Sequence, residues 1–281
     1  MQISLRKLLP IPIIIFAIAV SILLWNFIRT GDFVLLDVDL KGGTLVTIET
    51  DVPVDTILIE DHLGVKYGSV IASGLRTSTG FGANIEIPAA ANATELISDL
   101  AGLGIVTKAF SIESVGPALG SLFLQQVRDV LIAAFILMSI VIFIVYRKLV
   151  SSFAIVFAAL SNILTTLAVT SLLGIKISFA GFAGLLMLIA YTVDTNIVLT
   201  TKVLHTTPEE FKRKYRLALI TGLTLIATIS ITMSSVLLLS TSKLLVNVAE
   251  VLVVGFVSDL PFTWVLNAGL LESYVNRRKI V

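Results

Sequence analysis

The sequence contains no cysteine, and its two histidines, His62 and His205, stand far apart in the chain. Disulfide bonds and thiolate metal sites are therefore excluded, and we expect neither histidine to be a metal ligand. No H-E-x-x-H motif is present, and neither Asp194 nor Asp259 has a histidine beside it. The residues that an integral membrane hydrolase needs are missing, so the sequence predicts a protein that is not an enzyme and that holds no metal and no cofactor.

Charge is also scarce. Charged residues make up 14% of the chain and hydrophobic residues 56%, and the mean hydropathy is +1.00. This composition is typical of a membrane protein rather than of a soluble domain. The formal net charge of +1 gives no basic field that would attract nucleic acid. No G-x-x-x-x-G-K-[ST] phosphate loop occurs, so we expect no nucleotide either.

Six apolar runs are long enough to cross a bilayer as helices. The first covers residues 8–28, where the alternative to a membrane anchor is a cleaved signal peptide. We favour a retained anchor, because the apolar part of a signal peptide is usually only about 7–15 residues long. The sequence therefore predicts an α-helical membrane protein with six transmembrane helices. The other five runs cover residues 127–146, 153–173, 177–201, 217–240 and 245–270.

Residues 30–125 differ from the rest of the chain, because no apolar run in them is long enough to span a membrane. They carry twelve acidic and four basic residues, a net charge of −8. Short apolar runs alternate with turn residues in the order βαββαβ, which predicts a ferredoxin-like α+β domain. The strands are expected at residues 45–50, 67–75, 83–87 and 105–115, and the helices at 54–63 and 92–103.

The sequence thus predicts three parts: an N-terminal tip with the first transmembrane helix (1–29), the ferredoxin-like domain (30–125) and a five-helix bundle (126–281). Lysine and arginine in short loops set the orientation. Twelve of them fall on the side of the N-terminus, whereas the short loops of the opposite side hold two. We expect a multi-pass protein of the cytoplasmic membrane, with both termini cytoplasmic and the domain extracytoplasmic. Residues 208–216 are expected to form a separate short helix at the inner surface.

An acidic residue lies inside the fourth apolar run. Asp194 stands near the middle of that run, and a carboxylate at such a depth costs roughly 2.5–3.5 kcal/mol on insertion scales. It persists if it faces the interior of a bundle, finds hydrogen-bond partners or stays protonated. We interpret Asp194 as an ion or proton site, or as a conformational coupling point. The alternative is a protonated aspartate that only bonds neighbouring helices.

Polar residues on four spans share a similar depth, counted inward from each predicted helix end at about 1.5 Å per residue. In the sixth span, Asp259, a threonine and an asparagine follow one another at intervals of four residues, which places them on one face of a helix. Pro261 is expected to kink this helix. Glu250 is expected on the opposite face, as an interfacial acid or a contact with another subunit. Ordinary hydroxyl packing between helices is the alternative for the threonines. The candidate proton or coupling site comprises Asp194, Asp259, Asn162, Tyr191, Thr195, Asn196, Thr224, Thr228, Thr263 and Asn267.

Two glycine motifs flank the predicted domain. Val38-Asp-Leu-Lys-Gly-Gly-Thr44 leads into it, and Ser114-Val-Gly-Pro-Ala-Leu-Gly120 leads back to the membrane. Gly42 and Gly43 allow a sharp backbone turn, and Gly116 with Pro117 makes a rigid one. Neither motif follows a strand and opens a helix as a phosphate loop does, so we interpret both as structural motifs.

These motifs, followed by Tyr191-Thr-Val-Asp-Thr-Asn196 and by D-x-x-x-T-W-x-x-N from Asp259 to Asn267, resemble the SecF family and its archaeal members in particular. Members of this family are the smaller partners of SecD in protein export. The resemblance covers nearly the whole chain. It implies the fold of the resistance-nodulation-division superfamily. It also implies four kinds of partner: a SecD-like membrane protein, the Sec channel, the exported polypeptide in transit and membrane lipid.

The resemblance further implies an accessory role in protein export that is coupled to the proton gradient, as in bacterial members. The bacterial fifth span carries an arginine, whereas residues 217–240 of this chain contain no basic residue. Asp194 must therefore pair with polar groups, a proton or a charge on a partner. Two other functions stay open: a proton-coupled exporter subunit for lipids or small molecules, and a structural assembly subunit.

Overall fold

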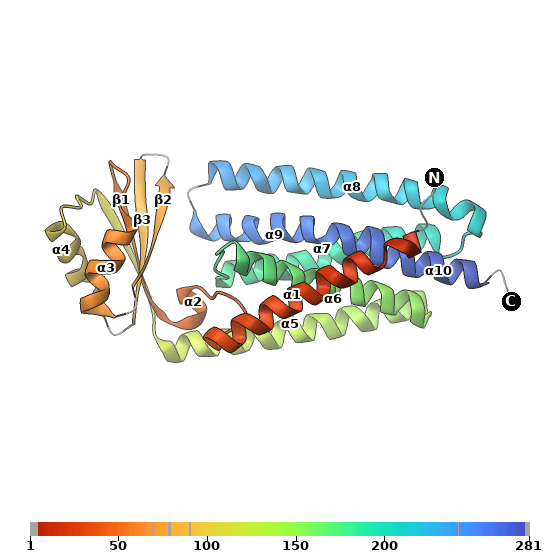
Figure 1. Cartoon of the computed structure of the whole chain (residues 1–281), viewed down its shortest axis with the longest axis horizontal. Coiled ribbons are helices and arrows are strands. Elements are labelled where there is room, and N and C mark those ends of the chain that lie inside the picture. The colour runs from red at the N-terminus through yellow and green to blue at the C-terminus, as the bar shows by residue number, and fades with distance from the viewer. Residues whose placement is uncertain (1–4, 69, 78–79, 90, 241, 279–281) are drawn as a thin grey trace. The chain divides into compact units, whose positions relative to one another are not determined.

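The computed structural model describes residues 5–68, 70–77, 80–89, 91–240 and 242–278. The chain divides into two compact units, and each is described here by itself (Figure 1). One unit is Leu36–Arg128, and the other combines Met1–Leu35 with Asp129–Val281. The extreme C-terminus, which we expect in the cytoplasm, lies outside the described residues.

The smaller unit is a four-stranded sheet with two helices on one face (Figure 1). The strand order is β2-β3-β1-β4, and every neighbouring pair is antiparallel. This is the order of a ferredoxin-like βαββαβ domain, so the predicted fold class is confirmed for this part. The elements are α2 (Val38–Lys41), β1 (Gly43–Thr50), α3 (Thr56–Tyr67), β2 (Ile71–Thr77), β3 (Gly80–Ile87), α4 (Ala93–Gly102) and β4 (Ala109–Val115).

Alternation along the central strands builds the core of this unit. Val46 and Ile48 of β1 and Ile85 of β3 are fully buried and pack against Leu63 of α3 and Leu100 of α4. Successive side chains of a strand point to opposite faces, so these residues share the face that the helices cover. The edge strand β4 is different, because Phe110 and Ile112 on that same face are 56% and 40% exposed.

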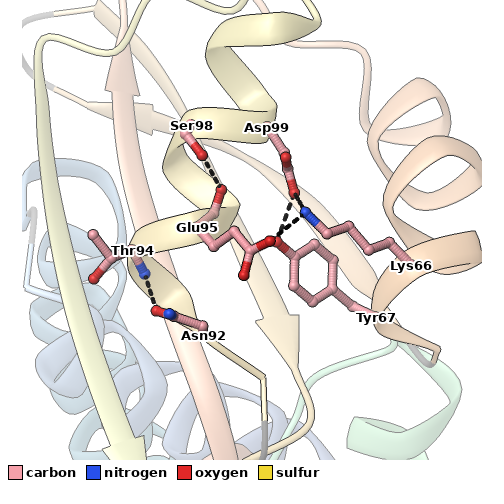
Figure 2. A network of polar contacts seen from close by, with 7 residues as sticks. All are labelled: Lys66, Tyr67, Asn92, Thr94, Glu95, Ser98 and Asp99. Carbon is pink, nitrogen blue, oxygen red and sulfur yellow. Dashed lines mark hydrogen bonds and ion pairs between the residues drawn. The ribbon is translucent and has the colours of Figure 1, made fainter.

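The two helices begin where side-chain caps occur. Asp55 accepts hydrogen bonds from the backbone N–H groups of Ile57 and Leu58, and Asn92 accepts one from Thr94 (Figure 2). Such caps satisfy N–H groups that have no partner inside the helix. Both helix starts follow the signals in the sequence.

Some predicted boundaries in this unit were wrong. The strand expected at residues 67–75 begins only at Ile71, because α3 continues to Tyr67 and ends at Gly68, where φ is 83°. The last strand begins at Ala109 rather than at residue 105. The short helix α2 was not predicted, and four residues are too few to give a periodic signal.

A surface network joins the two helices of the smaller unit (Figure 2). Lys66 on α3 donates to Asp99 Oδ2 on α4 at 2.7 Å and forms an ion pair with Glu95 at 2.8 Å. The Tyr67 hydroxyl donates to the same Asp99 oxygen at 2.6 Å. The hydrogen bond from Lys66, helped by that from Tyr67, holds the pKa of Asp99 below its ordinary value. The same contacts raise the pKa of Lys66.

The two glycine motifs meet within this unit. Gly42 ends α2 with a φ of 81°, and Pro117 begins the helix that directly follows β4. The expectation that neither motif follows a strand and opens a helix was therefore wrong for the second motif. A Cβ at Gly42 would lie 2.7 Å from the Pro117 Cα, and a Cβ at Gly120 would lie 2.6 Å from the Gly42 nitrogen. The backbones are thus too close for side chains at these glycines, so each motif makes its turn and also supports the other.

The larger unit consists of helices that are long and apolar enough to cross a membrane (Figure 1). Six such helices are found among the described residues, which confirms the predicted multi-pass fold. The last span changes from α9 to a π-helical segment and back to α10. The elements are η1 (Leu5–Leu8), α1 (Pro10–Thr30), α5 (Pro117–Tyr146), α6 (Leu149–Leu172), α7 (Phe179–Val203), α8 (Pro208–Leu239), α9 (Lys243–Pro261), η2 (Phe262–Asn267) and α10 (Ala268–Arg278).

The prediction of a separate surface helix at residues 208–216 was wrong. These residues are the first turns of α8, which runs unbroken from Pro208 to Leu239. Proline is favoured at the first helical position, and no second proline occurs before this helix ends. The charged N-terminal turns and the apolar span therefore form one helix.

Small residues bring the spans together, among them Gly181 and Gly184 of α7. A Cβ at Gly184 would lie 3.2 Å from the Val248 carbonyl oxygen of α9, and one at Gly181 would overlap Asn247. On α8, a Cβ at Gly222 would overlap the Trp264 ring. Close helix approach at small residues is the usual packing mode inside a membrane. The spans α6 and α7 are the most buried, whereas α5 and α8 are largely exposed.

Candidate functional site in the membrane bundle

Asp259 is a buried acid on α9, and its side chain is 2% exposed. Its Oδ2 accepts a hydrogen bond from the Thr263 hydroxyl at 2.9 Å and one from the Thr195 hydroxyl of α7 at 3.3 Å. Its Oδ1 has no hydrogen-bond partner among the described residues. The carboxyl group is thus held on one oxygen and left open on the other.

A chain of buried hydrogen bonds leads to this carboxyl group. The Asn267 side-chain N–H donates to Asn196 Oδ1 at 2.6 Å, and Asn196 donates to the Thr263 hydroxyl at 2.9 Å. Thr263 then donates to Asp259. Asn196, Thr263 and Asn267 are completely buried. Residues 196 and 267 lie on different spans, so the chain ties α7 to the last span through its polar interior.

One backbone carbonyl group sets the donor-to-acceptor direction of this series of hydrogen bonds. Asn196 Nδ2 also donates to the Thr192 carbonyl oxygen at 2.7 Å, and a carbonyl can only accept. This contact fixes the orientation of the Asn196 amide, so its Oδ1 must accept from Asn267. Because the Thr263 oxygen accepts from Asn196, its own hydrogen is left for Asp259. All three hydrogens therefore point toward the carboxyl group.

The π-helical segment lies where the sequence predicts a kink. Pro261 ends α9, and the following residues form η2, in which the Ala268 N–H bonds to the Thr263 carbonyl five residues back. Proline has no N–H for the helical ladder, which lets the backbone change its pitch. Short π-helical turns occur frequently at functional sites. Here the segment begins three residues after Asp259 and carries Thr263 and Asn267 into the network.

Asn162 connects a third span to the network. Its Nδ2 donates to the Thr192 hydroxyl at 2.7 Å, and the Thr166 hydroxyl donates to its backbone carbonyl at 2.8 Å. Asn162 is completely buried on α6. Thr192, which the candidate set leaves out, therefore joins α6 to α7 through its hydroxyl and orients Asn196 through its carbonyl. Its spacing of three and four residues from Thr195 and Asn196 is the signal that could have identified it.

A pocket of about 150 Å³ lies beside this network, between α7, α8 and α9. Both Asp194 and Asp259 line it, together with Tyr191 and Thr195. The Tyr191 ring packs edge-on against Phe256 with ring centroids 5.5 Å apart. Asp194 is exposed on the surface of this chain, unlike Asp259. The pocket is therefore lined by one buried acid and one exposed acid.

Thr224 and Thr228 lie outside the network. Their hydroxyls donate to carbonyls of their own helix α8, to Ile220 at 2.8 Å and to Thr224 at 2.9 Å, respectively. Both side chains are exposed. Glu250 does not line the pocket either, and it accepts a hydrogen bond from Asn247 at 3.3 Å. Counting residues gave the depth of these groups but not the direction in which each helix face points.

The chain is similar to proteins of export systems. The family described as "Protein export membrane protein SecD/SecF, C-terminal" matches residues 97–277. The protein-export membrane protein SecF of Pyrococcus furiosus is 33% identical, over 98% of this chain and 92% of that protein. The SecF of Methanothermobacter thermautotrophicus is 31% identical, over 98% of this chain and 94% of that protein.

A solved structure has a similar fold. The crystal structure of SecDF, a translocon-associated membrane protein from Thermus thermophilus, superposes with a TM-score of 0.77 at 18% identity. The similarity covers 98% of this chain but only 38% of the SecDF chain. At this identity the similarity shows the fold alone.

Proposed function

Because the chain belongs to the SecD/SecF family of protein-export membrane proteins, we propose that it is an accessory subunit of protein export across the cytoplasmic membrane. It acts with a SecD-like membrane protein, beside the Sec channel and the exported polypeptide. The SecDF chain of known structure supports this proposal, since 38% of its length corresponds to this chain and a separate partner would supply the remainder. In our proposal both termini are cytoplasmic and residues 30–125 lie outside.

We also propose that the site around Asp259 and Asp194 couples export to the movement of an ion, with the proton as the ion that the resemblance implies. The observation that carries this proposal is the open Oδ1 of a buried acid at the end of a directed hydrogen-bond chain. Burying a polar atom without a partner costs free energy. The same network joins α6, α7 and the last span, so a change at Asp259 would reach all three.

The exposed position of Asp194 supports a partner in the membrane. An acid that faced lipid at this depth would be costly, and intramembrane acids almost always face a bundle interior or a cavity. We therefore propose that the SecD-like protein covers this face of α7. The bonding of the Thr224 and Thr228 hydroxyls within α8 is compatible with either lipid or protein contact.

The test is export in cells that lack their own copy of this chain and carry a variant instead. Asp259→Asn and Asp194→Asn keep the shape of the side chain but remove ionisation, and Glu250→Gln makes the same chemical change away from the pocket. We expect the two aspartate variants to reach normal membrane levels and to lose export support, while Glu250→Gln keeps it. Full export by both aspartate variants at normal levels would leave the network as a structural contact between helices.

A further inference from the structure

A groove of about 450 Å³ runs along one face of α1. Ile14, Ile18 and Trp25 line it, and Leu172 at the end of α6 lines it as well. Residues four and seven apart lie on the same face of a helix, so the three α1 side chains form one continuous strip. This groove is separate from the pocket beside Asp259, which α7, α8 and α9 line.

The groove opens away from the interior of the bundle. Leu23 of α1 is buried in one cluster with Ala168 of α6, and this contact fixes the packed side of α1. Ile18 and Trp25, on the groove side, are 55% and 58% exposed. Because α1 is one of the helices that are long and apolar enough to cross a membrane, the groove faces lipid or another protein.

The polar groups in the lining are already satisfied. The Ser21 hydroxyl donates to the Ala17 carbonyl at 2.8 Å, and the Asn26 side chain donates to the Ser171 hydroxyl at 2.7 Å. Neither group needs water or an ion. Apart from these two side chains and the ring of Trp25, the lining is aliphatic. The groove therefore suits a hydrocarbon chain.

The length of the groove matches one leaflet of a bilayer. Its lining extends from Ile14 to Asn26, which is about 18 Å at 1.5 Å per residue. Asn26 lies in the last turns of α1, which ends at Thr30. The hydrocarbon core of a bilayer is about 30 Å thick, so one leaflet contributes about half of that. The groove thus runs from one membrane surface to about the middle, as an acyl chain does.

A positive charge stands at the surface end of the groove. The Arg29 guanidinium lies over the Trp25 ring, 5.2 Å from its centroid and one turn nearer the end of α1. A ring face does not neutralise this charge as a carboxylate would. In the orientation proposed above, the short loops on this side hold few bases, so Arg29 does not serve the topology. Arginine pairs readily with a phosphate group, and tryptophan is common at the membrane surface.

From this arrangement we propose that the groove along α1 binds one anionic phospholipid of the outer leaflet. One acyl chain lies along Ile14, Ile18 and Trp25, and Arg29 pairs with the phosphate. The bound lipid fills the groove and completes the outer surface of α1. This lipid site is independent of the coupling role proposed above, because it shares no residue with the pocket beside Asp259.

Quenching of tryptophan fluorescence by phospholipids with brominated acyl chains tests this proposal, because quenching requires contact with the ring. The chain has two tryptophans, and Trp264 is only 4% exposed, so subtracting the signal of Trp25→Phe isolates Trp25. The full-length chain is placed in bilayers that contain brominated phosphatidylglycerol or brominated phosphatidylcholine. We expect the anionic lipid to bind beside Trp25 about fivefold more strongly, the effect of one basic residue near a lipid surface.

Matched variants separate the charge from the groove. Arg29→Gln should lose the preference for the anionic lipid and Arg29→Lys should keep it, whereas Lys243→Gln removes a base of the same membrane side and should change nothing. Ala17→Phe places a ring inside the groove and should weaken the binding of both lipids beside Trp25. Leu24→Phe adds a ring on α1 outside the groove and is the control for it. An unchanged gel-filtration profile shows that each variant is folded.

Three results would overturn the proposal. The first is equal binding of the two lipids beside Trp25 in the unmodified chain, and the second is an unchanged preference in Arg29→Gln. The third is a Trp25 signal that neither lipid quenches, because a second copy of the chain would then cover the groove. Export can be lost or kept in these variants without changing the result, so failure of the lipid site and failure of the proposed function are distinguishable.

Discussion

Asn196 is the residue that makes the buried network continuous. Its amide group bonds to the Thr192 carbonyl, to Thr263 and to Asn267, so it joins α7 to the π-helical segment. The carbonyl of Thr192 orients it, and it in turn orients the hydroxyl that reaches Asp259. An asparagine suits this place because a single side chain offers both donors and an acceptor.

We expect Asn196→Ala to lower the free energy of unfolding by about 1–3 kcal/mol, because the buried Asn267 amide loses the acceptor at 2.6 Å and the buried Thr263 hydroxyl loses its donor. Thr224→Val is the matched control, since that hydroxyl is exposed and bonds only to its own helix. Thermal unfolding of both variants in detergent checks this difference. Equal loss of stability in the two variants would contradict the role assigned to the network.

At the scale of helices and strands, the sequence predicted the order and kind of the main elements because their signals are local. The helix caps at Asp55 and Asn92 and the long apolar runs can each be recognised from residues that are neighbours in the sequence. The ends of the elements were harder to predict from the sequence. For example, α3 continues past its apolar pattern until Gly68 changes the backbone direction. The continuous helix from Pro208 was missed, since the change from charged to apolar residues marks a change of environment rather than a helix end.

Only part of the candidate site could be predicted from the sequence, again because the signals in a sequence are local. Periodicity places Asp259, Thr263 and Asn267 on one face, and the structure brings them into one network with Asn196. Depth alone could not separate Thr228 from that network, because the rotation of α8 depends on packing of distant residues such as Trp264 against Gly222. The open Oδ1 of Asp259 has no signal in the sequence at all.

The contact between α3 and α4 lets us predict how the stability of the smaller unit changes with pH. Lys66 and Tyr67 lower the pKa of Asp99 below the ordinary value of 3.8. The folded domain therefore binds fewer protons at this group than the unfolded chain, so the stabilisation is present above that value and is lost as the pH falls through the lowered pKa. The raised pKa of Lys66 has the opposite sign and matters only in strongly alkaline solution.

We expect an expressed fragment of residues 36–115 to fold alone, because the sheet and both helices share their own buried core. Asp99→Asn should lower its thermal midpoint at neutral pH by a small amount, as is usual for exposed ion pairs. It should also reduce the loss of stability when the pH falls from about 5 to about 2. Asp61→Asn, an exposed acid of α3 outside this network, is the control. Circular dichroism measures both effects, and a disordered spectrum of the fragment would contradict the domain assignment.

At the scale of the whole molecule, several surfaces are unusual for a protein that acts alone. Asp194 is exposed within an apolar span, where a carboxyl group that faced lipid would be costly. In the smaller unit, β4 is an edge strand with exposed Phe110 and Ile112, and such edges are usually protected or covered. The opposite edge is better protected, because Glu60 accepts a hydrogen bond from the Ala72 N–H of β2.

These surfaces lead us to expect that the chain is isolated from native membranes in a complex with a SecD-like membrane protein. Extraction into native nanodiscs, followed by mass measurement of the particles, should give a fixed ratio of the two proteins. Asp194→Asn keeps a polar group at the covered surface and should preserve the complex, whereas Asp194→Leu removes that group and should release the partner. Recovery of the unmodified chain only as a monomer, both in mild detergent and in native membranes, would contradict the partnership. Equal retention of the partner by both variants would show that Asp194 lies outside the contact.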